Sequence, residues 1–207
     1  MIWLNIMNLN SEFVLPVFMF AITMLFTPGP NNILLMTSGL NYGVKATFWH
    51  IQGVALGFGA MFLIVGLGLG SVFIKYPQVH LVIKWLGISF MLYMAWKIST
   101  AVDLKKNKIS GKPMSFFQAV LFQWVNPKAW LISINGIGAF TTVGGDVIWQ
   151  VFAICLILTS VGYLSSSSWT IFGSVLQKII TNHRQYKIFN MLMAFFLVMA
   201  IIPLILE

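Results

Sequence analysis

The chain has 207 residues, of which 59% are hydrophobic and only 8% charged, and its formal net charge is +8. A composition this apolar excludes an ordinary soluble domain and is typical of a polytopic membrane protein. The twelve Lys and Arg residues fall mostly between apolar runs, where they act as topology signals and lipid-headgroup contacts rather than as a nucleic-acid surface. The single cysteine, Cys155, excludes an internal disulfide.

Six apolar runs are long enough to cross the hydrocarbon core of a bilayer as helices. They cover approximately Phe13–Leu40, Ala46–Ile74, Val79–Ala101, Phe116–Phe140, Ile148–Leu176 and Tyr186–Leu206. We therefore expect an all-α polytopic membrane protein with six transmembrane helices and no soluble domain. Residues 1–207 are expected to form one transmembrane domain of two halves, about 1–101 and 115–207, which a basic cytoplasmic linker over 102–114 connects.

The first predicted span is interrupted at residues 27–32, whose sequence is Thr-Pro-Gly-Pro-Asn-Asn. The two prolines and the glycine, Pro28, Gly29 and Pro30, cannot continue a helix without the loss of backbone hydrogen bonds. No water replaces the lost partners in hydrocarbon, so a broken membrane helix is tolerated only where it is buried in protein or lines a polar cavity. This break is the first candidate for a site where a substrate passes through the membrane.

The fourth predicted span is interrupted in a similar way at Asn126, Pro127 and Lys128. Lys128 is the only charged residue well inside a predicted span. A charge near the bilayer centre costs at least about 2.5–3.5 kcal/mol, so it normally has a partner or faces water. The alternative is that Lys128 extends its side chain to the membrane interface. Gln123, one turn earlier, favours a polar pocket.

The distribution of Lys and Arg predicts that both termini lie on the outer side of the membrane. In that orientation the cytoplasmic segments hold Lys45, Lys97, Lys105, Lys106, Lys108, Lys112, Lys178, Arg184 and Lys187. Only Lys75 and Lys84 fall on the outer side, together with three of the four acidic residues.

A weak internal repeat predicts two halves with opposite orientations in the membrane. A shift of 103 residues aligns the Gly-Ser-Val at 70–72 with the Gly-Ser-Val at 173–175, and Lys75 with Lys178. Each half holds three predicted spans, an odd number, so the second half enters the membrane from the other side. Proline-interrupted segments at corresponding positions of inverted halves point to the midplane site of a transporter. The alternative is two unrelated proline kinks.

The two breaks together offer groups that can bind a zwitterion. A helix that restarts after a break exposes free N–H groups and the positive end of its dipole. Asn31, Asn32 and Lys128 lie near these N-termini, where a carboxylate binds favourably. Carbonyls freed by the prolines, with Gln123, are acceptors for an ammonium group. No predicted span contains a carboxylate, so neither a metal nor a cofactor is expected.

Two aromatic side chains in other spans are further candidates for functional roles, one in substrate binding and one in proton coupling. Trp169 follows the serines at 165–168, and its ring is able to bind an ammonium group by a cation–π contact. Helix packing is the alternative role for most of this polar run. His50, early in the second span, is a candidate for proton coupling because the unperturbed pKa of histidine is about 6.5. A histidine that is satisfied by a neighbouring carbonyl is an equally good interpretation.

These motifs, in this order, resemble those of the LysE/RhtB family of amino-acid exporters over nearly the whole chain. They are Pro28-Gly29-Pro30-Asn31, Gly43, Leu86-Gly87, Tyr93, Trp96, Asn126-Pro127-Lys128, Trp169 and Gly173. The resemblance implies a multi-pass exporter of the cytoplasmic (inner) membrane that expels amino acids or their derivatives and is driven by the proton gradient. Residues 27–32 and 79–99 are most similar to the branch that exports cysteine and O-acetylserine.

The expected substrate is a small neutral amino acid or derivative. Relatives that export lysine or arginine can carry an acidic residue in the second span, where this chain has none, and a dibasic substrate would leave a charge uncompensated in low dielectric. We expect a secondary exporter that works by alternating access as a proton antiporter. A passive channel, or an exporter of another small metabolite, is the alternative. An enzyme would need convergent catalytic groups, and the sequence shows no such set. The expected partners are the amino acid, protons and membrane lipid, and small-residue helix faces permit a homodimer.

Overall fold

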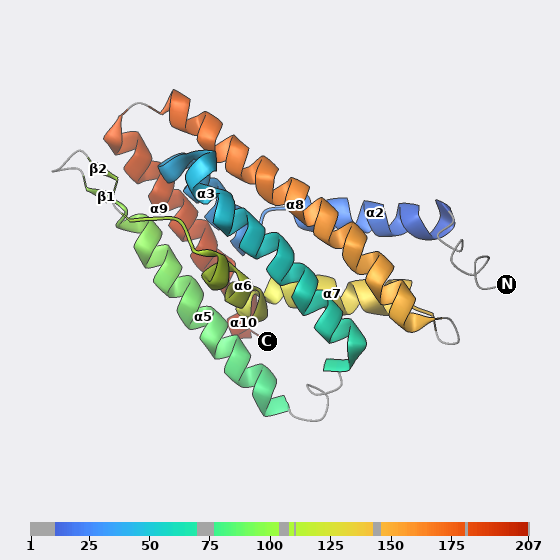
Figure 1. Cartoon of the computed structure of the whole chain (residues 1–207). Helices are drawn as coiled ribbons and strands as arrows, with labels where there is room; N and C mark the ends of the chain where they lie inside the picture. The colour runs from blue at the N-terminus through green and yellow to red at the C-terminus, as the bar shows by residue number, and fades with distance from the viewer. Residues whose placement is uncertain are drawn as a thin grey trace.

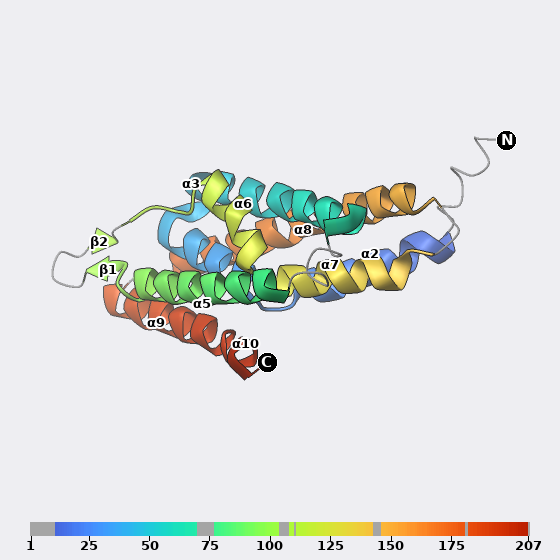
Figure 2. The same ribbon diagram turned by 90° about the horizontal axis from the view of Figure 1, so that it is seen from below.

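The computed structural model describes residues 11–69, 77–103, 108–109, 111–142, 146–180 and 182–206, which form a bundle of helices (Figures 1 and 2). In chain order the elements are α2 (Ser11–Phe26), α3 (Pro30–Ile64), the π-helical segment η1 (Val65–Leu69), α5 (Pro77–Ser99), β1 (Val102–Asp103), β2 (Lys108–Ile109), α6 (Phe116–Val125), α7 (Pro127–Phe140), α8 (Val147–Ile179), α9 (His183–Met199) and α10 (Ile202–Leu206). β1 and β2 form a short antiparallel pair within the predicted linker, which the all-α expectation did not include.

Three helical stretches are long and apolar enough to cross a membrane by themselves: Pro30–Gly68, Leu81–Ser99 and Val147–Ile179. Phe13–Phe26 and Phe116–Val125 are shorter apolar helices. The count of six spans, their division into halves and the inverted repeat stay predictions. Residues 70–76, which carry part of the predicted repeat, lie outside the described residues, as do residues 1–10 and Glu207.

α3 contains a sharp kink at Gly43, between the first and second predicted spans. The backbone of Gly43 has φ 81° and ψ 169°, a conformation that glycine adopts without the strain of a Cβ atom. α3 is therefore two helical segments joined at Gly43, where the chain changes direction. The sequence predicted a gap between Leu40 and Ala46, but a single glycine is enough for this turn.

α3 and α8 form the centre of the bundle. α3 packs most extensively against α8 and also against α6, while α5 packs against α9. The axes of α3 and α8 come very close at two glycines. A Cβ atom at Gly39 would overlap the carbonyl oxygen of Thr170, and one at Gly173 would overlap that of Met36. Small residues permit this direct backbone contact between helices.

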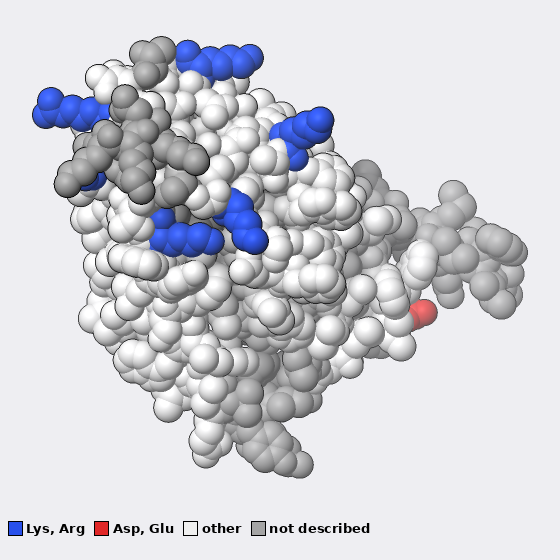
Figure 3. All heavy atoms as spheres, turned by 60° about the vertical axis from the view of Figure 1, so that its left-hand side comes forward, with Lys and Arg blue, Asp and Glu red and all other residues white. Residues whose placement is uncertain are grey.

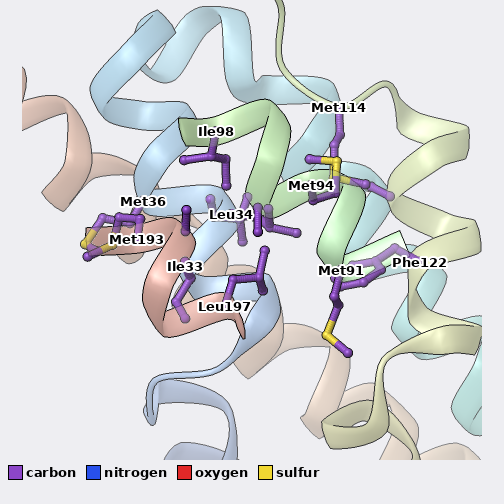
Figure 4. Packing of buried hydrophobic residues seen from close by; sticks show 14 of the residues in the cluster. Ile33, Leu34, Met36, Met91, Met94, Ile98, Met114, Phe122, Met193 and Leu197 are labelled. Atoms are coloured by element: carbon purple, nitrogen blue, oxygen red, sulfur yellow. The ribbon is translucent and has the colours of Figure 1, made fainter. Parts of the chain in front are cut away.

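Apolar side chains fill the bundle on both sides of the helix breaks. One cluster lies where α3, α5, α6 and α9 meet, and Figure 4 shows Leu34, Met94 and Leu197 among its members. Another cluster joins α2, α3, α7 and α8 and includes Phe58 and Ala129. The interrupted helices are therefore held by packing from both directions.

The Lys and Arg side chains gather over one end of the molecule, as Figure 3 shows. At this end lie the last turns of α5 and α8, which contain Lys97 and Lys178, and the start of α9, which contains Arg184. Asp146 caps the opposite end of α8. An excess of Lys and Arg at one end is the asymmetry that orients membrane proteins with the basic end inside, and the orientation of this chain stays a prediction.

Candidate functional site

The first break separates α2 from α3. α2 ends at Phe26, and α3 restarts with Pro30 in its first turn after the extended residue Gly29. Within the described residues no side chain caps this start, and the N–H of Ile33 donates to the carbonyl of Gly29 at 2.9 Å. The N–H groups of Asn31 and Asn32 belong to the turn that has no intrahelical acceptor, so this N-terminus is a positive pole.

The carbonyls at the end of α2 are satisfied by side chains from elsewhere in the chain. Asn32 Nδ2 donates to the carbonyl oxygens of Leu25 and Thr27, both at 2.8 Å. Ser165 Oγ of α8 donates to the same Leu25 oxygen at 2.7 Å. A carbonyl oxygen has two lone pairs, so the acceptor capacity of Leu25 is filled. Side-chain donors thus replace the backbone donors that the Leu25 and Thr27 carbonyls lose at the break.

Lys128 joins the two breaks directly. Its Nζ donates to the carbonyl oxygen of Thr27 at 2.7 Å, to Thr27 Oγ1 at 2.7 Å and to the carbonyl oxygen of Pro28 at 3.2 Å. An ammonium group has three donors, and these three contacts use all of them. The Lys128 ammonium therefore lies at the end of α2, across the site from its own helix.

Asn31 and Gln123 form a second bond between the two breaks. Asn31 Nδ2 donates to Gln123 Oε1 at 2.8 Å, and Gln123 Nε2 donates back to Asn31 Oδ1 at 3.2 Å. Gln123 Nε2 also donates to the carbonyl oxygen of Ala119 at 2.9 Å, and the Gln123 side chain is fully buried. This reciprocal amide pair fixes the start of α3 against α6.

The second break is shorter than the first. α6 ends at Val125 and α7 begins at Pro127, so Asn126 alone separates them. Asn126 Oδ1 accepts from the backbone N–H of Lys128 at 3.1 Å, which caps α7. The free N–H groups of α7 that the sequence predicted are therefore partly used by the chain itself, and the uncapped start of α3 is the stronger anion site.

A cavity with about 470 Å³ of empty space, part of it open to solvent, lies between the two breaks. The predicted residues Gly29, Asn31, Asn32, Asn126 and Lys128 all line it. Its other walls come from α2, α3, α7 and α8, namely Met24, Leu25, Val54, Ala55, Phe58, Ala129, Ile132, Gly162, Ser165 and Ser166. Pro28, Pro30 and Pro127 shape the breaks, and Gln123 reaches the cavity through Asn31. The structure thus brings the two predicted motifs together.

The described lining of this cavity carries positive charge but no negative charge. Among the described lining residues, Lys128 is the single charged side chain, and no carboxylate is present. Ser165 and Ser166 add hydroxyl groups, while Met24, Phe58 and Ile132 supply apolar wall. The cavity therefore offers one cation, several neutral polar groups and an apolar surface, which suits a small molecule with one carboxylate.

Two predicted residues lie apart from this cavity. Trp169 lines a shallow groove with Phe26, Ser168 and Phe172, and its ring centroid is 6.4 Å from that of Phe172. His50 lies at a second cavity, described below, and is buried there. Neither residue is positioned to contact a ligand between the two breaks in this structure.

The sequence placed Thr27 in the first break and Ser165 in a polar run, but it did not predict the contacts that these two residues make in the site. Thr27 binds the Lys128 ammonium through both its hydroxyl and its carbonyl, and Ser165 closes the end of α2. A threonine directly before the Pro-Gly-Pro is a signal that could have been used, because a broken helix needs local acceptors. Which of the four consecutive serines faces the break depends on how α8 packs, and the sequence does not give that.

Gly29 makes room for Lys128, and its replacement tests this contact. A Cβ atom at Gly29 would lie 2.7 Å from Cδ and 3.1 Å from Nζ of Lys128. The φ angle of −176° is open to any residue, so Gly29→Ala displaces the lysine without backbone strain. Loss of about one charge-assisted hydrogen bond predicts roughly a tenfold decrease in transport. Uptake into vesicles measures the change, with an unaltered melting temperature as the sign of an intact fold; wild-type transport by Gly29→Ala would contradict this role.

The long apolar helices and the polar cavity between interrupted helices define a membrane transport protein. The sequence matches the family described as LysE type translocator over residues 22–207, and the chain belongs to this family. It is therefore a translocator and not an enzyme. The resemblance inferred from the order of the motifs is confirmed.

Several relatives match most of the chain. Proteins named cysteine/O-acetylserine efflux protein from Escherichia coli (strain K12), Escherichia coli O9:H4 (strain HS) and Shigella sonnei (strain Ss046) are each 30% identical over 174 residues, or 83% of this chain and 87% of the relative. No solved structure matches the chain.

Proposed function

We propose that the protein is a secondary active exporter of small neutral amino acids or their derivatives across the cytoplasmic membrane. The observation that carries the proposal is the cavity between the two breaks, where the uncapped start of α3 and the Lys128 ammonium lie together with no described carboxylate in the lining. The efflux of cysteine and O-acetylserine named for the relatives supports the same class of substrate.

The substrate carboxylate binds between the N-terminus of α3 and Lys128. The N–H groups of Asn31 and Asn32 and the helix dipole favour an anion at this place. The longest of the three Lys128 contacts, 3.2 Å to the Pro28 carbonyl, is the one that a carboxylate replaces most easily. Lys128 then exchanges a bond within the break for a bond to the substrate, so binding loosens the link between α2 and α7.

The substrate ammonium binds to hydroxyl groups rather than to the freed carbonyls. The carbonyls of Leu25 and Thr27 each already accept two bonds from the chain, from Asn32 together with Ser165 or Lys128. Gln123 Oε1 is taken by Asn31. The hydroxyl oxygens of Ser165 and Ser166 line the cavity and keep lone pairs for an ammonium group.

Transport follows from alternating access around the two breaks. Six spans in two inverted halves, about 1–101 and 115–207, place the cavity near the midplane with both termini outside. The proton carrier is His50, Lys128 in its neutral form, or the substrate itself. A homodimer, surrounded by lipid, is compatible with the small-residue helix faces.

A substrate panel in proteoliposomes tests the function. With an imposed proton gradient, O-acetylserine and cysteine should be transported at least about tenfold faster than lysine or arginine, because an unpaired second charge near Lys128 costs several kcal/mol in low dielectric. Preferential transport of lysine or arginine would contradict the proposed substrate class. Transport that continues unchanged after collapse of the gradient would remove proton coupling. Counterflow separates a carrier from a passive channel, which shows none.

A further inference from the structure

A second polar cavity lies beside the basic end of the molecule. It has about 360 Å³ of empty space, part of it open to solvent, and shares no lining residue with the cavity between the breaks. Its polar wall comes from Thr37, Ser38 and Asn41 of the first part of α3 and from His50 beyond the kink. Lys97 at the end of α5 and Lys112 before α6 also line it.

Two residues that line this cavity have buried polar atoms with no hydrogen-bond partner among the described residues. These atoms are both ring nitrogens of His50, whose side chain is 1% exposed, and Oγ1 of Thr37, whose side chain is 3% exposed. An unmatched buried polar group costs about 1–3 kcal/mol. The neighbouring polar groups do not remedy this, because Asn41 pairs reciprocally with Asn190 at 3.1 and 3.2 Å and Ser38 accepts from Thr47 at 3.3 Å. The ring nitrogens of His50 and the hydroxyl of Thr37 are therefore available to bind a ligand in the cavity.

The charge around these atoms selects an anion. The titratable lining residues are Tyr42, His50, Lys97 and Lys112, and no Asp or Glu lies in the described lining. Lys97 is half-buried and Lys112 exposed, so their ammonium groups raise the local potential at the cavity. A His50 ring N–H and the Thr37 hydroxyl are donors for acceptor oxygens. A carboxylate supplies the negative charge and the acceptors together.

Both cavities lie along the same half of α3. Asn31 and Asn32 line the first cavity and Thr37 lines the second, about 9 Å further along the axis at 1.5 Å per residue. Between Asn32 and Thr37, α3 presents Leu34, which packs with Met94 in the apolar cluster of Figure 4 and forms with it part of the apolar wall of the second cavity. His50 lies one turn before Val54, which lines the first cavity. An apolar layer thus separates two anion-compatible sites on one helix.

We infer that the second cavity is a carboxylate-binding entrance site, in which Thr37 and His50 hold the substrate before it crosses the apolar layer. The inference rests on the proposed function for the identity of the carboxylate as that of an amino acid. The site itself is tested without transport.

A single-cysteine experiment measures the charge preference of the cavity. In a Cys155→Ala background, Ser38→Cys places a thiol in the lining, and Ser99→Cys places one at the same basic end outside it. The rate of modification by an anionic sulfonatoethyl methanethiosulfonate, divided by the rate with its cationic trimethylammonioethyl analogue, should be about tenfold higher at position 38 than at position 99. Equal ratios, or no modification at position 38, would overturn the inference.

Protection by a ligand then identifies the carboxylate and its partners. L-serine should slow modification of Ser38→Cys, while L-serinamide at matched ionic strength should not. Addition of Thr37→Val, which keeps the shape and removes the hydroxyl, should abolish the protection, and Thr159→Val, which lines neither cavity, should keep it. Protection by both ligands, or protection that survives Thr37→Val, contradicts the site. If the carboxylate-specific protection appears in a protein that exports no amino acid, the proposed function fails while the site holds.

Discussion

Replacement of Lys128 by alanine should reduce amino-acid efflux by at least about 100-fold while the protein remains folded in the membrane. Removal of one member of a desolvated charge pair costs about 2–5 kcal/mol, and 1.4 kcal/mol corresponds to a factor of ten. The lost ammonium is the single cation in the described lining of the cavity, and it also joins Thr27 to α7. The fold should survive because Asn32 still binds the Thr27 carbonyl and because Thr27 is exposed. Efflux rate and melting temperature in detergent measure the two effects separately.

The matched control is Lys84→Ala, the same substitution at a half-buried lysine of α5 that lines neither cavity. It should transport like the wild type. Asn31→Ala provides a second test of the same site, since it removes the amide that pairs with the buried Gln123. Normal efflux by both Lys128→Ala and Asn31→Ala would refute the assignment of the cavity as the substrate site.

The positions of the helix breaks could be predicted because the chemistry of proline is local. Pro28 and Pro30 cannot donate backbone hydrogen bonds, and the structure ends α2 before them and restarts α3 at Pro30. Pro127 likewise begins α7. The motifs also predicted a shared polar pocket for Lys128 and Asn31, with extension of Lys128 to the membrane interface as the alternative, and both residues line one cavity.

The partners of these groups could not be predicted, because they depend on how distant helices pack. Lys128 reaches a carbonyl 101 residues away, and Asn31 pairs with a glutamine 92 residues away. The direction of Trp169 depends on the rotation of α8, which turns Ser165 and Ser166 to the cavity and the indole to the groove with Phe172. The kink at Gly43 could not be predicted either. The gap between two apolar runs suggested a loop, whereas in the structure a single glycine makes the turn.

Gly173→Ala should destabilise the protein strongly, because the added methyl group has no room where α3 and α8 cross. The added Cβ would overlap the carbonyl oxygen of Met36 and would lie 3.0 Å from the backbone nitrogen of Leu40. Both neighbours are backbone atoms of α3 and cannot rotate away as a side chain could. The two helices must therefore move apart. Overpacking of this kind costs about 1–3 kcal/mol, occasionally more. The expected decrease in melting temperature is about 5 °C or more for a chain of this length.

Gly138→Ala is the matched control, because no described atom lies within 4 Å of a Cβ at that position of α7. Alanine is a better helix former than glycine, so this variant should melt at or slightly above the wild-type temperature. Gly39→Ala, which meets the carbonyl of Thr170 on the other side of the same crossing, should behave like Gly173→Ala, and the two losses should not add because both force the same displacement. Since α3 also carries Asn31 and Asn32, the displaced helix should lower transport together with stability. Wild-type melting of Gly173→Ala would show that α3 and α8 do not cross at these glycines.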